Sequence, residues 1–342
     1  MSRSVFRNAP TGLLSSYLKE VSQVLLRSRT QISRLSFKTA FQSWRSRIRA
    51  GISIVKMKLT IIIPTFNSIR TLRRCLDSIA KQSFTDFEVI LQDGGSSDGT
   101  HDETGEFSLA HPDVAIRMIV EKDDGIYDAM NRAMRRAKGQ WLYFLGSDDE
   151  LHDEHVLERI FTSLMDEPCD MIYGNAVLFG FEGWKPDGTI YDGAFHLQKL
   201  MDANICHQSI FYKTHFVRNR VGEYNTRYRT HADWDFNLRC WTSTKPKYME
   251  ILVAKFYGGG ASSVKSDTEF EPDFLKNIMF YFSLSSFDPM INRSSFRYYG
   301  KVLAQQRIEN RLRFLCDAIS KRVSCRVQRY SHWLRQTFRD AG

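Results

Sequence analysis

The sequence predicts an α/β fold: a mostly parallel sheet flanked by helices, followed by a helical C-terminal extension. Four short apolar runs, each about the length of a strand, occur between residues 58 and 145. Helix-like patterns lie between some of them, as expected when parallel strands are joined by crossover helices. Polar residues follow these runs, and in such sheets ligands bind beyond the carboxyl ends of the strands.

The four expected strands differ in how they end. Pro64 closes the first run, and Asp93 with a glycine-rich turn closes the second. The strands are expected within residues 58–67, 87–93, 116–121 and 141–145.

Two helices are expected between these strands. Ser68 is predicted to cap a helix from about Ile69 to Gln82, whose buried stripe comprises Leu72, Leu76 and Ile79. A second helix opens within residues 121–133 and is expected to end near Gly139, because glycine suits a helix C-cap.

The pattern is looser after residue 150. In order, we expect a helix over 154–165, a strand over 170–175, a hairpin around 184–188, a strand over 206–213, a helix starting within 230–241 and helical structure from about 271 onward.

Length and composition exclude several classes of protein. The chain has 342 residues, of which 42% are hydrophobic, enough to bury a full core in one or two domains. No apolar run reaches the 18 residues that indicate a membrane-spanning helix. The six cysteines form no CxxC pair, which favours reduced thiols. His152 and His155 do not have the HExxH zinc spacing, and we expect them on the solvated side of a helix start.

The charge of +9 is unevenly distributed, which predicts three segments: a basic N-terminal extension (1–56), a catalytic domain (57–265) and a basic helical C-terminal region (266–342). Residues 1–56 carry 11 Lys and Arg and one Glu, residues 290–342 carry 12 and three acids, and the middle is therefore −10. Basic flanks indicate an anionic membrane surface as partner, and no nucleic-acid-binding motif is present. For the C-terminal region the alternative is a solvated helical face packed on the body. The first segment is a membrane-surface helix, a transit peptide or a stretch upstream of a true start at Met57.

Asp148 and Asp149 stand directly after the fourth apolar run. Adjacent carboxylates at a strand end are suited to hold a divalent cation against a phosphate. Asp124, Tyr127 and Asp128 open the second expected helix beyond the third strand, so they can reach the same crevice. Capping and solvation are the alternative roles for these three side chains.

Six motifs together resemble family 2 glycosyltransferases over residues 57 to about 262. The chain is most similar to bacterial enzymes that build exopolysaccharide, colanic-acid-like or O-antigen repeat units, and the resemblance does not cover the tails. The motifs are Pro64-Thr-Phe-Asn67, Asp93-Gly-Gly-Ser-Ser-Asp-Gly-Thr100, Gly125-Ile-Tyr-Asp-Ala-Met-Asn131, Gly146-Ser-Asp-Asp149, His207-Gln208 and Asp233-Trp-Asp235.

The resemblance implies a nucleotide-diphospho-sugar transferase sheet with a defined donor site. Thr65 and Asn67 would line the nucleotide pocket, and Asp93 would accept a hydrogen bond from the base. Asp148 would lie near the ribose, and Asp149 would ligate the Mg²⁺ or Mn²⁺ that bridges the diphosphate. A divalent cation would stabilise the charge of the leaving nucleoside diphosphate.

The resemblance also implies the base that activates the acceptor. Asp233 would remove the proton of the acceptor hydroxyl, and displacement from the opposite face would invert the anomeric centre. Asp235 is the rival for this role, and a helix cap or dipole partner is the alternative for Asp233. His207 would contact phosphate or acceptor; a structural role is the alternative.

Two departures from the family pattern affect the metal site and the base. Gly146 and Ser147 stand where the family often has acids, and Ala232 replaces the usual Glu before the base. The prediction is therefore a metal-dependent inverting glycosyltransferase at the cytoplasmic face of the cell membrane. Its donor would be a UDP-sugar, as is usual in the family that it resembles, and its acceptor would be a saccharide or a lipid-linked molecule. The alternative function is a non-catalytic nucleotide- or saccharide-binding protein that keeps the fold.

Overall fold

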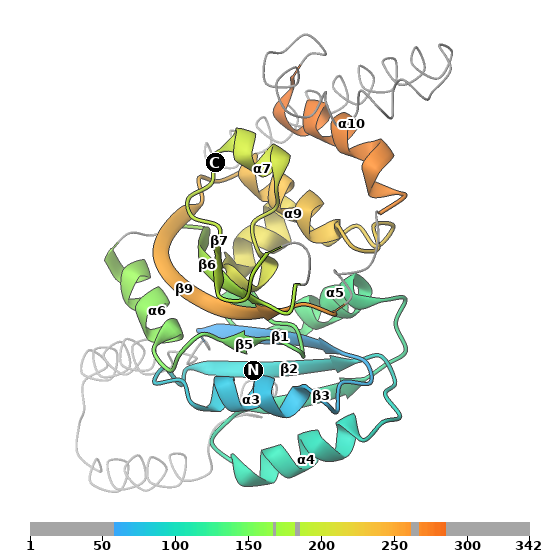
Figure 1. The fold of residues 1–342 in the computed structure, drawn as a ribbon, viewed down its shortest axis with the longest axis vertical. Coiled ribbons are helices and arrows are strands. Elements are labelled where there is room, and N and C mark those ends of the chain that lie inside the picture. The colour runs from blue at the N-terminus through green and yellow to red at the C-terminus, as the bar shows by residue number, and fades with distance from the viewer. Residues whose placement is uncertain (1–57, 167–168, 182–184, 261–266, 285–342) are drawn as a thin grey trace, which may run out of the picture. The chain divides into compact units, whose positions relative to one another are not determined.

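The computed structural model describes residues 58–166, 169–181, 185–260 and 267–284 (Figure 1). The basic N-terminal extension and most of the predicted helical C-terminal region lie outside these residues. Within them, no helix is long and apolar enough to cross a membrane.

Nine strands of the described residues form one mixed sheet, and its first half is parallel. In spatial order this half contains β3 (Ile116–Val120), β2 (Phe87–Asp93), β1 (Leu59–Thr65) and β4 (Trp141–Phe144). All residues of β1 and β2 are buried, as expected for parallel strands covered on both faces. The predicted α/β class is therefore confirmed.

The second half of the sheet begins where β8 pairs antiparallel with β4. β6 then pairs antiparallel with β8 and parallel with β9. The strands of this half are β8 (Ile210–Lys213), β6 (Met171–Phe179), β9 (Lys247–Tyr257), β5 (Glu150–Leu151) and β7 (Thr189–Tyr191). β6 and β7 form the hairpin predicted around residues 184–188.

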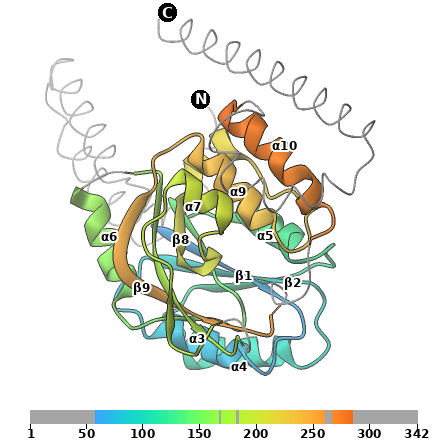
Figure 2. The same ribbon diagram turned by 45° about the horizontal axis from the view of Figure 1, so that its top comes forward.

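Helices cover both faces of the sheet (Figures 1 and 2). α3 (Leu72–Ala80), α4 (Thr100–Ala110) and α6 (Val156–Asp166) pack with one hydrophobic cluster, and α5 (Ile126–Arg136), α9 (Ala232–Trp241) and α10 (Phe270–Phe282) pack with the other. The shorter helices are α7 (Leu197–Asp202), η1 (His207–Ser209), α8 (Thr214–Phe216) and η2 (Val217–Val221).

The role predicted for Ser68 is wrong, although the buried stripe of its helix is right. α3 begins at Leu72, and no side chain caps it. The Ser68 backbone carbonyl accepts hydrogen bonds from Thr71 N and Leu72 N. Its hydroxyl instead lies 2.8 Å from the Ser147 hydroxyl, so Ser68 ties the end of β1 to the loop after β4.

Gly139 is not a helix cap either, because α5 ends at Arg136. A Cβ atom at position 139 would lie 2.4 Å from Thr60 N. Glycine is required here by the close approach of the backbone to β1.

The sequence patterns missed α4, α7, α8, η2, β5 and β9. α4 has a weak apolar stripe, since its buried residues are Thr100, Thr104 and Phe107. β9 is only partly buried over most of its length, which removes the alternation that identifies a half-buried strand.

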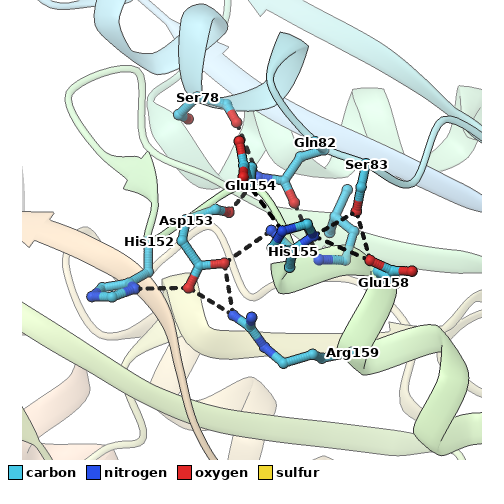
Figure 3. A network of polar contacts seen from close by, with 10 residues as sticks. Ser78, Gln82, Ser83, His152, Asp153, Glu154, His155, Glu158 and Arg159 are labelled. Carbon is cyan, nitrogen blue, oxygen red and sulfur yellow. Dashed lines mark hydrogen bonds and ion pairs between the residues drawn. The ribbon is translucent and has the colours of Figure 1, made fainter.

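His152 and His155 lie in a network of acids and polar side chains (Figure 3). His152 Nδ1 lies 3.2 Å from Asp153 Oδ2, and His155 Nδ1 lies 3.2 Å from Glu158 Oε2. Arg159 Nη2 donates to both Asp153 oxygens at 2.8 and 2.7 Å. Within the described part of the chain, no group of three or more His, Cys, Asp or Glu could hold a metal ion.

We expect Asp153→Asn to weaken the acid dependence of unfolding. Burial opposes the charge of Asp153, but hydrogen bonds from Arg159, His155 N and His152 outweigh it and lower its pKa from 3.8 to about 2. The stability that this carboxylate contributes is therefore present above pH 3.8 and lost as the pH falls through about 2. Since the side chain is 38% exposed, we expect its contribution to the free energy of unfolding to be less than about 1 kcal/mol. Urea unfolding of the native chain and of Asp153→Asn at pH 7 and pH 2.5 measures this contribution. Asp113→Asn, which removes an exposed acid, is the control and should leave the pH dependence of unfolding unchanged. The same pH dependence in the native chain and in Asp153→Asn would contradict the prediction.

Candidate functional site

Asp93, at the end of β2, is fully buried and organises the glycine-rich turn that follows it. Its Oδ1 accepts from Gly95 N (2.9 Å), Ser96 N (2.8 Å) and His101 Nε2 (2.9 Å). Its Oδ2 accepts from Thr65 Oγ1 (3.0 Å) and Ser96 Oγ (2.6 Å). Burial opposes the charge, but the hydrogen bonds from His101, Ser96 and Gly95 lower the pKa of Asp93. The carboxylate therefore holds the ends of β1 and β2 together.

The segment after β1 continues this edge of the sheet. Asn67 has a left-handed φ of 52°, and its Oδ1 accepts from Ser97 N at 3.0 Å. Phe66, which lies between Thr65 and Asn67, is 65% exposed. An exposed aromatic ring beside the expected nucleotide pocket is suited to stack on a base, and the sequence analysis did not single it out.

The Gly146–Asp149 turn places its two acids, Asp148 and Asp149, in different surroundings. Asp149 is fully buried; its Oδ1 accepts from Tyr257 N at 2.9 Å and its Oδ2 from Gln208 Nε2 at 2.8 Å. Asp148 instead lines a cavity. Burial raises the pKa of both carboxyls. A Cβ atom at Gly146 would lie 2.4 Å from Asp149 Oδ2, so this turn leaves no space for an acid there.

The cavity has a volume of about 730 Å³ and brings together Tyr127, Asp148, His207 and Asp233. Apolar side chains, among them Met130 and Phe256, form much of its wall. Arg229 is a cation on the lining that the sequence analysis did not single out.

Asp233, in the first turn of α9, lines the cavity with both carboxylate oxygens positioned. Tyr127 Oη donates to its Oδ1 at 3.0 Å, and Asn204 Nδ2 donates to its Oδ2 at 2.8 Å. Asp235 is buried elsewhere: Tyr281 Oη donates to its Oδ1 at 2.8 Å, and Arg239 Nε to its Oδ2 at 2.9 Å. Asp235 thus joins α9 to α10, whereas Asp233 is open to a ligand.

His207 lines the same cavity without a hydrogen-bond partner. The residue is 8% exposed, and neither ring nitrogen has a partner among the described residues. Burial lowers the pKa of His207, against the opposing charge of Asp233. A neutral imidazole can offer a ligand one donor and one acceptor.

The acids near the start of α5 do not all lie where the sequence predicted them. Asp124 is exposed and does not line the cavity, although Arg229, which does, donates to the Asp124 carbonyl at 2.7 Å. Asp128 pairs with Arg132 at 2.8 Å. Asp123 instead lies over Gly94, at the end of β2. Sequence spacing alone cannot distinguish neighbouring acids in a turn.

Solved structures with a similar fold include two of Staphylococcus aureus TarS 1–349. The one in complex with UDP-GlcNAc has a TM-score of 0.58 and 16% sequence identity, and the match covers 79% of this chain and 81% of that one. The one in complex with UDP has a TM-score of 0.57 and 17% identity, covering 78% and 81%. At these identities the likeness shows the fold.

Sequence relatives give the family. The PGL/p-HBAD biosynthesis glycosyltransferase of Mycobacterium bovis is 42% identical over 218 residues, which cover 62% of this chain and 81% of that protein. Glycosyltransferase GlyA of Streptococcus pneumoniae is 29% identical over 144 residues, covering 42% of this chain and 19% of that protein. The model of the family "Glycosyl transferase family 2" matches residues 60–232. The chain is thus a glycosyltransferase and belongs to family 2.

Proposed function

We propose that this nucleotide-sugar-dependent glycosyltransferase transfers a sugar to a saccharide or lipid-linked acceptor during synthesis of a cell-envelope glycoconjugate. The single observation that carries the proposal is the cavity shared by Asp148 and Asp233, with its polar and apolar walls. The similar M. bovis protein is named for PGL/p-HBAD biosynthesis, which supports a biosynthetic glycosyltransferase. The TarS structures contain UDP or UDP-GlcNAc, which supports a UDP-sugar donor.

Asp233 is the proposed general base. Its oxygens accept from Tyr127 and Asn204, so the carboxylate is held in one orientation and retains lone pairs for the acceptor hydroxyl. The acceptor oxygen attacks the anomeric carbon as Asp233 takes its proton, and the nucleoside diphosphate leaves from the opposite face. This order of bonds inverts the anomeric centre.

Asp148 is suited to bind a divalent cation. Mg²⁺ usually takes one or two carboxylates together with phosphate oxygens, and Asp148 is the acid of the pair that lines the cavity. Asp149, predicted from sequence as the ligand, is fully buried, accepts hydrogen bonds from Gln208 and Tyr257 N, and does not line the cavity. We therefore assign the Mg²⁺ or Mn²⁺ ligand to Asp148 and the shaping of the turn to Asp149. When bound, the cation would stabilise charge on the leaving diphosphate.

The remaining site residues are proposed to hold the donor. Phe66 would stack on the base, while Thr65 and Asn67 fix the backbone around it. His207 would bind a polar group of the donor or acceptor, because its buried nitrogens otherwise stay unsatisfied.

A peripheral position at the cytoplasmic membrane face is proposed from the charge of the two tails. Polybasic segments bind anionic surfaces, and the attraction weakens with salt. The full chain should sediment with phosphatidylserine-containing vesicles at low salt and not with neutral ones. Equal sedimentation with both kinds of vesicle would contradict this placement.

The transferase proposal is tested by nucleoside-diphosphate release from UDP-, GDP- and dTDP-sugars with Mg²⁺ or Mn²⁺. We expect metal-dependent release from one donor, increased by membrane extract as a source of acceptor. Tight nucleotide binding without release under any of these conditions would contradict turnover and favour the non-catalytic alternative.

A further inference from the structure

Asp123 lies over the backbone at the carboxyl end of β2. Gly94 follows Asp93 directly, and a Cβ atom at Gly94 would lie 2.9 Å from Asp123 Oδ2. Glycine at this position therefore leaves the space that the carboxylate occupies. Asp123 Oδ1 accepts from Gly125 N at 2.9 Å, whereas Oδ2 accepts no hydrogen bond from the described residues.

Asp93, in contrast, has no capacity left for a nucleobase. Five donor atoms already point at its two oxygens, and a carboxylate offers about four lone-pair sites. The residue is also 0% exposed. A sixth donor from a ligand would have to displace one of the bonds that shape the turn.

Asp123 is partly buried, and among the described residues Gly125 N is the donor to its carboxylate. Burial raises its pKa, Gly125 N opposes the shift, and the charges of Asp128 and Asp93 add to it. In register, Asp93 pairs with Val120 of β3 and with Thr65 of β1, so Asp123 and Phe66 follow the two strands that flank β2. A base stacked on Phe66 would lie at this same edge.

We propose that Asp123, and not Asp93, accepts the ring N–H of the donor's nucleobase and so selects among nucleotides. Uracil, thymine and guanine present such an N–H, whereas cytosine and adenine present a ring nitrogen lone pair that a carboxylate repels. The assignment rests on the proposed function, because it concerns the donor pocket of that same site. A site built to bond a substrate N–H rejects analogues that lack it.

The test is calorimetric binding of UDP, GDP, CDP and ADP, with Mg²⁺, to the full chain and two variants. The native chain should prefer UDP or GDP over CDP and ADP. Asp123→Asn should bind the preferred nucleotide about 10- to 100-fold more weakly, as expected for loss of a hydrogen bond to a charged group. Its affinity for CDP should hold or rise, because the new amide donates to cytosine N3. Asp124→Asn, at the exposed neighbouring acid, should match the native chain.

An unchanged UDP-to-CDP ratio in Asp123→Asn overturns the assignment while leaving the proposed function intact. A native chain that binds none of the four nucleotides overturns both. If Asp123→Asn fails to fold, Asp123→Glu provides the second variant: it retains the charge, so it should bind UDP more weakly and still reject CDP. Acceptance of CDP by the folded Glu variant would also contradict the role.

Discussion

Asp233→Asn should lower the rate of sugar transfer by about 10²- to 10⁴-fold, the usual contribution of a positioned general base. Asparagine has nearly the same shape and can still accept a hydrogen bond from Tyr127, but it cannot take a proton from the acceptor. The loss should appear in kcat, measured from nucleotide release with saturating donor and acceptor. Binding of UDP should remain close to that of the native chain.

Asp235→Asn is the matched comparison because it changes an acid two residues away on α9. Its carboxylate is buried against Arg239 and Tyr281, so the substitution should destabilise the fold by about 1–3 kcal/mol. The rate per folded molecule should fall much less than in Asp233→Asn. A larger catalytic loss in Asp235→Asn, with Asp233→Asn active, would reverse the assignment of the base.

Asp148→Ala should abolish the response of transfer to Mg²⁺ or Mn²⁺ and lower the rate by about 10²-fold or more, since a bound cation contributes several kcal/mol to stabilising transition-state charge. The variant should still fold, because the Asp148 side chain lines a cavity and is not part of the core. Transfer rates measured against metal concentration, together with UDP binding with and without Mn²⁺, would show both effects. A chelator should bring the native chain to the rate of the variant.

Asp149→Asn is the control for this prediction. The asparagine oxygen can accept from Tyr257 N, and the Gln208 amide can rotate to accept from the new amide group, so the buried contacts remain satisfied. We expect a folded enzyme that retains its metal response. Loss of that response in Asp149→Asn, with Asp148→Ala still metal-dependent, would restore the ligand assignment made from sequence.

The parallel half of the sheet could be predicted from sequence because its signal is local. β1 and β2 are continuous apolar runs, and burial on both faces requires such runs. The end of each run then places Thr65, Asp93 and Asp148 at one edge, which follows from parallel topology alone. β9 gave no such signal, and its place between β6 and β5 depends on pairing with distant strands.

The roles of neighbouring acids depended on contacts that no local pattern records. Asp149 is distinguished from Asp148 by Tyr257, which lies 108 residues further along the chain, and Asp233 is positioned by Tyr127 across 106 residues. The side chains of successive residues in a turn point in directions that the spacing in the sequence does not specify. This is why Asp124 was predicted at the site, whereas Asp123 lies over β2.

The sequence by itself determined the α/β class, the parallel core and the family, because these follow from periodic burial and from motifs carried in order along the chain. Only the tertiary structure decided which carboxylates are open to ligands and which are consumed by the fold. Asp93, Asp149 and Asp235 are buried and accept hydrogen bonds from donors elsewhere in the chain, whereas Asp148 and Asp233 line the cavity. A carboxylate that packing removes from the cavity cannot reach a ligand there, and that burial depends on contacts between distant segments.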